Sequence, residues 1–302
     1  MRSPDREPEL IRLDRVLVTR LDVQDIDSIN SAMRAGIAAF GRIDVLVNNA
    51  GYGAYGPRKA TSDERIRRQF EVNVLGPLAA ARAIIPHFRA NRAGTLVNIA
   101  SVGGRLAFPL GALYQGTKFA LEGISEALHY ELAALGIRVK VIEPGAMKTD
   151  FAGRSFDFSN DEGIAEYQPL VQSIVAAFGP FMAGGSSPEQ VAEVILAAAT
   201  DESDRLRYAA GADAERILAT RQPGRRHVLC RHQAPVWITL TVSRSRSHSG
   251  SRRDRPAGTV SPAGEARRSG PCARHSRTQS APAAPVDARA PHRRDRSRSS
   301  PA

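Results

Sequence analysis

Cysteine, tryptophan and long apolar runs are scarce in this chain of 302 residues. The two cysteines, Cys230 and Cys272, allow at most one disulfide and lack the close spacing of a metal site. No uncharged apolar run approaches the ~18 residues that a membrane helix needs, and residues 1–12 lack the apolar centre of a signal peptide. These absences argue against a disulfide scaffold, a metal centre and a membrane partner, and we expect a cytoplasmic protein.

Positive charge is abundant but unevenly placed. The chain has 42 lysines and arginines against 31 acidic residues, a net charge of +11. Residues 222–302 hold 17 arginines, no lysine and four acidic residues, so they carry +13 and leave −2 on residues 1–221. The same segment has nine prolines and no Phe or Tyr, and it cannot bury enough apolar surface to offset the entropy of ordering. We therefore predict a domain at 1–221 and a disordered basic tail at 222–302.

Three explanations compete for this tail. It could bind nucleic acid through phosphate charge, it could be a plain solvated tail, or it could be the product of a reading-frame shift. We favour the frame shift, because a stretch rich in Arg, Ala, Pro, Ser and Gly but free of Lys is typical of GC-rich DNA read out of frame. Nucleic acid is thus not the expected partner. The alternative function is a catalytically impaired protein whose tail binds nucleic acid non-specifically.

Short apolar runs alternate with amphipathic stretches along residues 1–221. In the clearest helix, apolar residues recur at three- and four-residue spacing from Ile26 to Phe40, between Asp25 as N-cap and Gly41. Repeated strand–helix–strand units require a parallel sheet with helices on both faces. We therefore predict an α/β fold with a doubly wound, Rossmann-like parallel sheet. The expected strands are 16–23, 43–47 (buried), 95–100, 138–143 and 206–209, and the expected helices are 26–40, 62–89, 113–135 and 188–199.

Tyr114 and Lys118 lie four residues apart at the start of a predicted helix, so their side chains share one face. An ammonium near a phenol lowers the phenol pKa from about 10 and favours acid–base use at neutral pH. Such a pair often arises by chance as two surface residues. The position of Ser101 favours a functional pair over two surface residues. Ser101 ends a predicted strand thirteen residues before Tyr114, so it meets the helix at the same edge of the sheet. Ligands of such sheets bind at this edge.

Further motifs accompany this group of residues. In chain order the motifs are Asn48-Asn49-Ala50-Gly51, Asn73-Val74-Leu75-Gly76, Ser101, Tyr114-Gln115-Gly116-Thr117-Lys118 and Pro144-Gly145-Ala146-Met147-Lys148-Thr149. Together they resemble the short-chain dehydrogenase/reductase family, in family order and spacing across roughly residues 14–150. The resemblance implies an NAD(P)-dependent oxidoreductase that interconverts a small-molecule alcohol and a carbonyl compound by hydride transfer.

The resemblance assigns a role to each of four catalytic residues. Tyr114 would be the general acid/base, and Ser101 would hydrogen-bond the substrate oxygen. Lys118 would hold the nicotinamide ribose and lower the tyrosine pKa, and Asn73 would hold a water that links Lys118 to solvent. Tyr114 and Lys118 would thus also contact the cofactor.

Other matching positions would bind the cofactor. Asp22, with Val23, would contact the adenine, although a short Asp at a strand end is also an ordinary cap. Arg2 matches a position that often binds the 2′-phosphate of NADP, which favours NADP over NAD. The remaining candidates are Asn48, Ala50 and Gly51 near the ribose and central sheet, Pro144 and Gly145 under the nicotinamide, and Thr149 on its carboxamide, where it could equally cap a local turn.

Residues 151–181 fall where the family has its variable substrate lid. Phe156, Phe158 and Tyr167 could line an apolar pocket or belong to the core, and the region resembles that of members acting on lipophilic alcohols, steroids or retinoids. The family often forms homodimers or homotetramers through the helices that correspond to 62–89 and 113–135.

The family pattern opens with a strand, a Gly-rich turn and a helix that binds the pyrophosphate. This sequence has no such turn, and Met1-Arg2-Ser3 look like the end of the family's second strand. We therefore expect an N-terminally truncated domain that keeps the four catalytic residues but binds dinucleotide weakly.

Overall fold

The computed structural model describes residues 2–4, 8–148 and 155–220, all of them within the first of two units into which the chain divides, Met1–Ser243. Thr149 and the tail 222–302 lie outside the described residues, so the role predicted for Thr149, the domain boundary and the disorder of the tail stay predictions. None of the helices described is long and apolar enough to cross a membrane.

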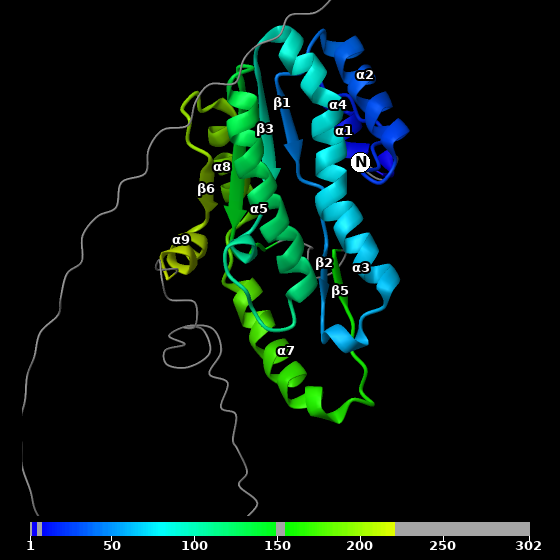
Figure 1. Cartoon of the computed structure of the whole chain (residues 1–302), viewed down its shortest axis with the longest axis vertical. Coiled ribbons are helices and arrows are strands. Elements are labelled where there is room, and N and C mark those ends of the chain that lie inside the picture. Colours follow the sequence, from blue (N-terminus) through cyan, green and yellow to red (C-terminus); the bar gives the residue numbers. More distant parts are fainter. Residues whose placement is uncertain (1, 5–7, 149–154, 221–302) are drawn as a thin grey trace, which may run out of the picture. The chain divides into compact units, whose positions relative to one another are not determined.

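A parallel sheet forms the centre of the described part of the chain (Figure 1). Its strands run in the order β1-β3-β4-β6, and every neighbouring pair is parallel. Parallel neighbours require crossovers, and helices supply them. The predicted doubly wound α/β fold is confirmed. The strand bounds are β1 Val45–Asn48, β3 Gly94–Ile99, β4 Ile137–Pro144 and β6 Arg207–Ala210.

Helices cover both faces of this sheet. Successive residues of a strand point to opposite faces, and in β3 Leu96 belongs to one buried cluster while Val97 belongs to another. The Leu96 cluster is shared with α2 (Ile26–Phe40), α4 (Gly76–Asn91) and α5 (Ala112–Ala133), and the Val97 cluster with α8 (Pro188–Thr200).

Local capping signals fix several helix ends as predicted. The Asp25 side chain accepts hydrogen bonds from two backbone N–H groups at the start of α2, and Gly41 ends the helix with φ of 84°. Ser187 forms a capping box at the start of α8, where Pro188 occupies the first turn.

Two strand predictions are corrected. Residues 16–22 have no regular secondary structure, and they do not join the sheet that the structure describes. An apolar run becomes a strand only beside a strand that accepts its hydrogen bonds, and Val16 and Leu17 are each 43% exposed. The strand predicted at 43–47 exists as β1, but β1 is an edge strand and Val47 is 39% exposed, so its predicted burial is wrong.

The predicted helix 62–89 is interrupted. It consists of α3 (Asp63–Phe70), a π-helical turn Glu71–Leu75, and α4. Pro77 has no N–H to donate to the carbonyl of Asn73 four residues earlier, which accounts for the wider turn. The interruption matters because it contains Asn73.

Several short elements were not predicted. Strands β2 (Gly53–Tyr55) and β5 (Phe156–Phe158) form a separate two-stranded parallel sheet, and α7 (Gln168–Ala183) follows β5. The others are α1 Pro8–Ile11, α9 Ala212–Ala219, and 3₁₀ turns Arg58–Ala60, Val102–Gly104 (η4) and Ala165–Tyr167.

Candidate active site

A cavity of about 600 Å³ opens at the carboxyl ends of the central strands. In parallel sheets the residues after these strand ends form the ligand site. Those residues line the cavity as expected from the sequence: Asn49 and Gly51 after β1, Ala100 and Ser101 after β3, and Pro144 and Gly145 at the end of β4.

Three candidate catalytic side chains converge on this cavity. Ser101 follows β3, and its hydroxyl is hydrogen-bonded to the side chain of Tyr114 near the start of α5. The Ser101 Oγ also accepts a hydrogen bond from Gly103 N at 3.0 Å, which fixes its position. Lys118 Nζ lies 5.7 Å from the centroid of the Tyr114 ring and donates a 2.7 Å hydrogen bond to the carbonyl of Ile99.

Burial has the largest effect on the pKa values of Tyr114 and Lys118. It raises the pKa of Tyr114 above its ordinary value of 10.0, although the hydrogen bond with Ser101 acts in the opposite direction. It lowers the pKa of Lys118 to about 8, which the Glu122 carboxylate opposes. The Tyr114 pKa is therefore raised in this structure and not brought toward neutrality as expected, and Lys118 is not among the groups that shift it.

Asn73 lies beside the lysine but makes its own hydrogen bonds to protein. Its side-chain amide donates to the carbonyl of Tyr52 at 2.9 Å and accepts from Tyr52 N at 3.1 Å, and it also contacts Thr117 Oγ1 at 3.1 Å. A Cβ added to Gly51 would lie 3.3 Å from Asn73 Oδ1 and 3.8 Å from Lys118 Nζ. The structure thus brings Gly51, Asn73 and Lys118 together.

The Asn48 side chain is hydrogen-bonded inside the sheet and not at the cavity. Its amide donates to Asn98 Oδ1 at 2.9 Å and to Pro77 O at 3.3 Å, and Asn98 in turn donates to Ser125 Oγ at 2.8 Å. This buried chain of hydrogen bonds joins β1, β3 and α5. Asn48 is not among the described residues that line the cavities, whereas its neighbour Asn49 is. These bonds support the expected bracing of the sheet by Asn48, and its contact with the cofactor stays a prediction.

A second cavity of about 500 Å³ adjoins the first, since Arg2, Gly51, Tyr52 and Ser155 line both. It collects the other cofactor candidates, namely Asp22, Val23 and Ala50. The Asp22 carboxylate also accepts a 3.1 Å hydrogen bond from Gln24 N, so Asp22 caps a local turn as well as facing this cavity.

The family model for short chain dehydrogenases matches residues 8–160. An uncharacterized oxidoreductase of Schizosaccharomyces pombe is 46% identical over 216 residues, which cover 70% of this chain and 88% of the relative. The chain belongs to the short-chain dehydrogenase family. The predicted enzyme class, a short-chain dehydrogenase/reductase, is confirmed.

Two solved structures place this family member among its relatives. A short-chain dehydrogenase from Streptomyces avermitilis is 35% identical with a TM-score of 0.63, covering 73% of this chain and 80% of that one. A 3-ketoacyl-(acyl-carrier-protein) reductase from Brucella melitensis, complexed with NADH, is 25% identical with a TM-score of 0.54, covering 67% of this chain and 80% of that one.

The aromatic wall of the first cavity in this dehydrogenase was only partly predicted. Tyr55 stacks on Tyr114 with ring centroids 5.3 Å apart and on Phe156 at 5.1 Å, and Phe178 of α7 stacks on Phe156 at 5.0 Å. Tyr55, Phe178 and Phe181 line the cavity, whereas Phe156 lines the second one, and Phe158 and Tyr167 are not among the described lining residues. Sequence reasoning missed Tyr55 and Phe178, which join the site only through the β2–β5 pair and α7.

Asp213 was also missed. It is 5% exposed, lies in the first turn of α9, and accepts a 2.7 Å hydrogen bond from Ala146 N through its Oδ2. A Cβ on Gly145 would overlap this carboxylate. Asp213 therefore supports the turn at Pro144-Gly145, and Gly145 is required there because only glycine leaves room for it.

Proposed function

We propose that this protein interconverts an alcohol and a carbonyl compound, with NADP or NAD as hydride carrier and Tyr114 as general acid/base. The observation that carries the proposal is the convergence of Ser101, Tyr114 and Lys118 on one cavity at the carboxyl ends of the sheet. A hydroxyl, a phenol and an ammonium at one wall can bind a carbonyl oxygen and give it a proton.

Each side chain would do one task. Tyr114 would pass its phenolic proton to the carbonyl oxygen, and its raised pKa favours the protonated form at neutral pH, which suits carbonyl reduction. Ser101 would hold the same oxygen through its hydroxyl and stabilise the charge that develops there. Lys118 would hold the ribose next to Tyr114, and Asn73 would hold a water between Lys118 and solvent.

The residues around the two cavities suit a nicotinamide dinucleotide. An elongated ligand could extend from the Tyr114 wall to the second cavity. There the Asp22 carboxylate suits an adenine, and three arginines, Arg2, Arg65 and Arg68, suit phosphate. The nicotinamide ring would supply or accept the hydride. Pro144 and Gly145 would lie under this ring, and Arg2, which lines the second cavity where the adenosine end would lie, supports NADP over NAD. The reductase from Brucella melitensis that holds NADH supports a nicotinamide cofactor.

The substrate proposed is a lipophilic ketone or its alcohol. Aromatic rings and aliphatic side chains dominate the wall beside Tyr114, and Tyr55, Phe178 and Met147 are among them. Apolar surface of this kind binds apolar ligands by releasing water.

The proposal is tested on the purified 302-residue protein. NADPH or NADH is mixed with a panel of ketones of increasing apolar size, and oxidation of the cofactor is followed by absorbance. We expect turnover that rises with apolar size and that is higher with NADPH. No turnover of any carbonyl compound at saturating concentrations of either cofactor would contradict the proposal.

Replacing Phe178 by alanine is expected to raise KM for a lipophilic ketone by about ten- to a hundredfold with little change in kcat. The ring contributes binding surface of the order of 1.5–3 kcal/mol and does not touch the reacting atoms. Steady-state kinetics with one long-chain and one short-chain ketone measure the effect. Val175→Ala on the same helix is the control, since Val175 is 54% exposed. An unchanged KM for the long-chain ketone would show that α7 does not bind substrate.

A further inference from the structure

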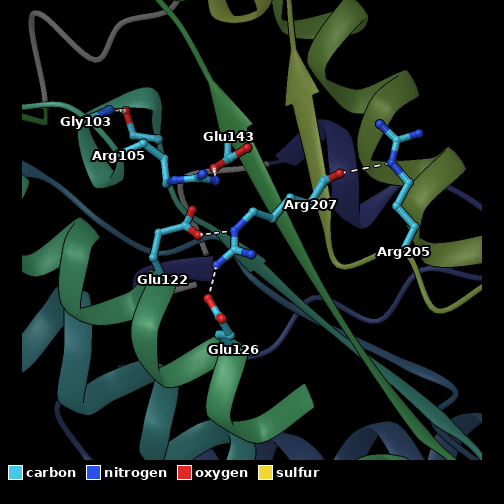
Figure 2. A network of polar contacts seen from close by, with 8 residues as sticks. Gly103, Arg105, Glu122, Glu126, Glu143, Arg205 and Arg207 are labelled. Carbon is cyan, nitrogen blue, oxygen red and sulfur yellow. Dashed lines mark hydrogen bonds and ion pairs between the residues drawn. The ribbon is translucent and has the colours of Figure 1, made fainter. Parts of the chain in front are cut away.

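A network of two buried carboxylates and two partly exposed guanidinium groups lies next to the site (Figure 2). Glu122 of α5 and Glu143 of β4 are only 4% and 3% exposed. Arg207 of β6 donates to Glu122 Oε2 at 2.9 Å, and Arg105 donates to Glu143 Oε1 at 2.8 Å. Buried charges of this kind are retained only when they are paired.

This network joins the elements that carry the candidate catalytic groups. Arg105 directly follows the η4 turn, and Ser101 directly precedes that turn as its N-cap. Glu143 directly precedes Pro144-Gly145. Glu122 lies one helical turn after Lys118, on the same face of α5. Figure 2 shows Arg207 of β6 joined to Glu122 and Glu126, and Arg105 joined to Glu143.

The space between Glu122, Lys118 and the η4 turn is closed. A Cβ on Gly104 would lie 2.9 Å from Glu122 Cγ and 3.0 Å from the carbonyl oxygen of Lys118, so backbone covers this part of α5. One carboxylate oxygen of Glu122 is held by Arg207, and the other, Oε1, has no hydrogen-bond partner among the described residues. In this buried setting the negative charge of the Glu122 carboxylate favours the charged form of Lys118.

We propose that Glu122 is a positioning residue that holds the positive charge on Lys118, while Arg207 and the Arg105–Glu143 ion pair keep the Glu122 carboxylate in place. The significance of this coupling for the reaction rests on the function proposed for Lys118, but the coupling itself does not.

The charged groups around Glu122 determine the pH range in which Glu122 supports the charge on Lys118. Burial and the neighbouring Glu143 raise the pKa of Glu122 to about 7, against the opposing effects of Arg207 and Arg105. Burial lowers the pKa of Lys118 to about 8, and Glu122 acts against that fall. Glu122 supports the ammonium where Glu122 is ionised and Lys118 is still protonated. Because burial raises one pKa and lowers the other, this pH range is narrow and lies near neutrality.

The test is a lysine titration of the cofactor-free 302-residue protein. The chain contains only four lysines, so the carbon-13 NMR spectrum of labelled lysine side chains is simple. The signal that disappears in Lys118→Arg belongs to Lys118. In Glu122→Gln we expect the titration midpoint of Lys118 to fall by about half a pH unit or more, because a nearby opposite charge is removed.

Two further variants keep the result interpretable. Glu122→Asp retains the carboxylate and should restore most of the midpoint, even if both replacements lower thermal stability. Glu126→Gln removes a second carboxylate that binds Arg207 but is 47% exposed and one turn further from Lys118, and it should leave the midpoint unchanged. An unchanged midpoint in Glu122→Gln, or an equal fall in Glu126→Gln, would overturn the proposal.

The pH dependence of kcat distinguishes the coupling between Glu122 and Lys118 from the catalytic role proposed for Lys118. If Lys118 acts as proposed, the alkaline limb of the kcat–pH profile in Glu122→Gln moves to lower pH together with the NMR midpoint. A midpoint that moves without any movement of the kinetic limb supports the coupling and contradicts the catalytic role of Lys118.

Discussion

Replacing Tyr114 by phenylalanine is expected to lower kcat/KM for carbonyl reduction by a factor of about 10²–10⁴, the usual contribution of a positioned general acid. The substitution removes the phenolic oxygen that Ser101 holds and keeps the ring that stacks on Tyr55. Folding and cofactor binding should therefore change little, and the loss should fall on kcat. Steady-state kinetics, together with titration of the cofactor by fluorescence, measure both quantities.

Tyr130→Phe is the matched control for this experiment. It makes the same chemical change on the same helix, but Tyr130 is 71% exposed and far along α5 from the cavity. We expect wild-type kinetics from this variant. If Tyr114→Phe kept wild-type activity, proton transfer by Tyr114 would be refuted, and another acid at this cavity would have to be sought.

Local signals explain which parts of the fold could be predicted. The bounds of α2 match the prediction residue for residue, because its N-cap Asp25 and its final Gly41 are encoded next to the helix itself. The apolar run at 16–23 failed for the opposite reason. Whether such a run becomes a strand depends on a neighbouring strand, and a sequence pattern does not specify that neighbour.

Elements that meet only in three dimensions were missed in the same way. Strand β2 pairs with β5, so that Gly53 lies opposite Phe156, about a hundred residues away in the chain. This pairing is what carries Phe156 to Tyr55 and, with α7, forms the aromatic wall. Short strands of three residues have no periodic pattern long enough to be recognised.

In the candidate site, too, residues with local sequence signals were predicted, and residues that meet only in the folded structure were missed. Ser101, Tyr114 and Lys118 were predicted because their signals are local in the sequence. These signals are the four-residue spacing of Tyr114 and Lys118, the strand end before Ser101, and the family motifs that contain all three residues. The Tyr114 pKa is raised in the structure and not lowered as expected, since the sequence shows the ammonium four residues away but not the burial that raises this pKa. Asp213, Glu143 and Arg207 were missed because they reach the site from separate elements late in the chain or across the sheet.

Replacing Phe88 by alanine is expected to destabilise the protein by about 3–5 kcal/mol, the usual loss for a large core aromatic side chain. Phe88 is fully buried between α4 and the sheet, with Ile84 and Leu96 in the same cluster. A Cβ on Gly94, at the start of β3, would overlap its ring, so backbone and ring are packed without spare space. The cavity left by alanine could not be filled by a small movement of the strand.

Urea unfolding followed by circular dichroism measures this loss, and Phe40→Ala is the control because Phe40 is 53% exposed at the end of α2. The control should change stability by about 0.5 kcal/mol or less. A domain has only ~5–15 kcal/mol of stability in all, so the Phe88 variant should lose a large share of it. Because β3 leads directly from Gly94 to Ser101, activity in this variant should be lost at the same urea concentration as the fold. Activity that outlasted the unfolding of the sheet would show that the site does not depend on β3.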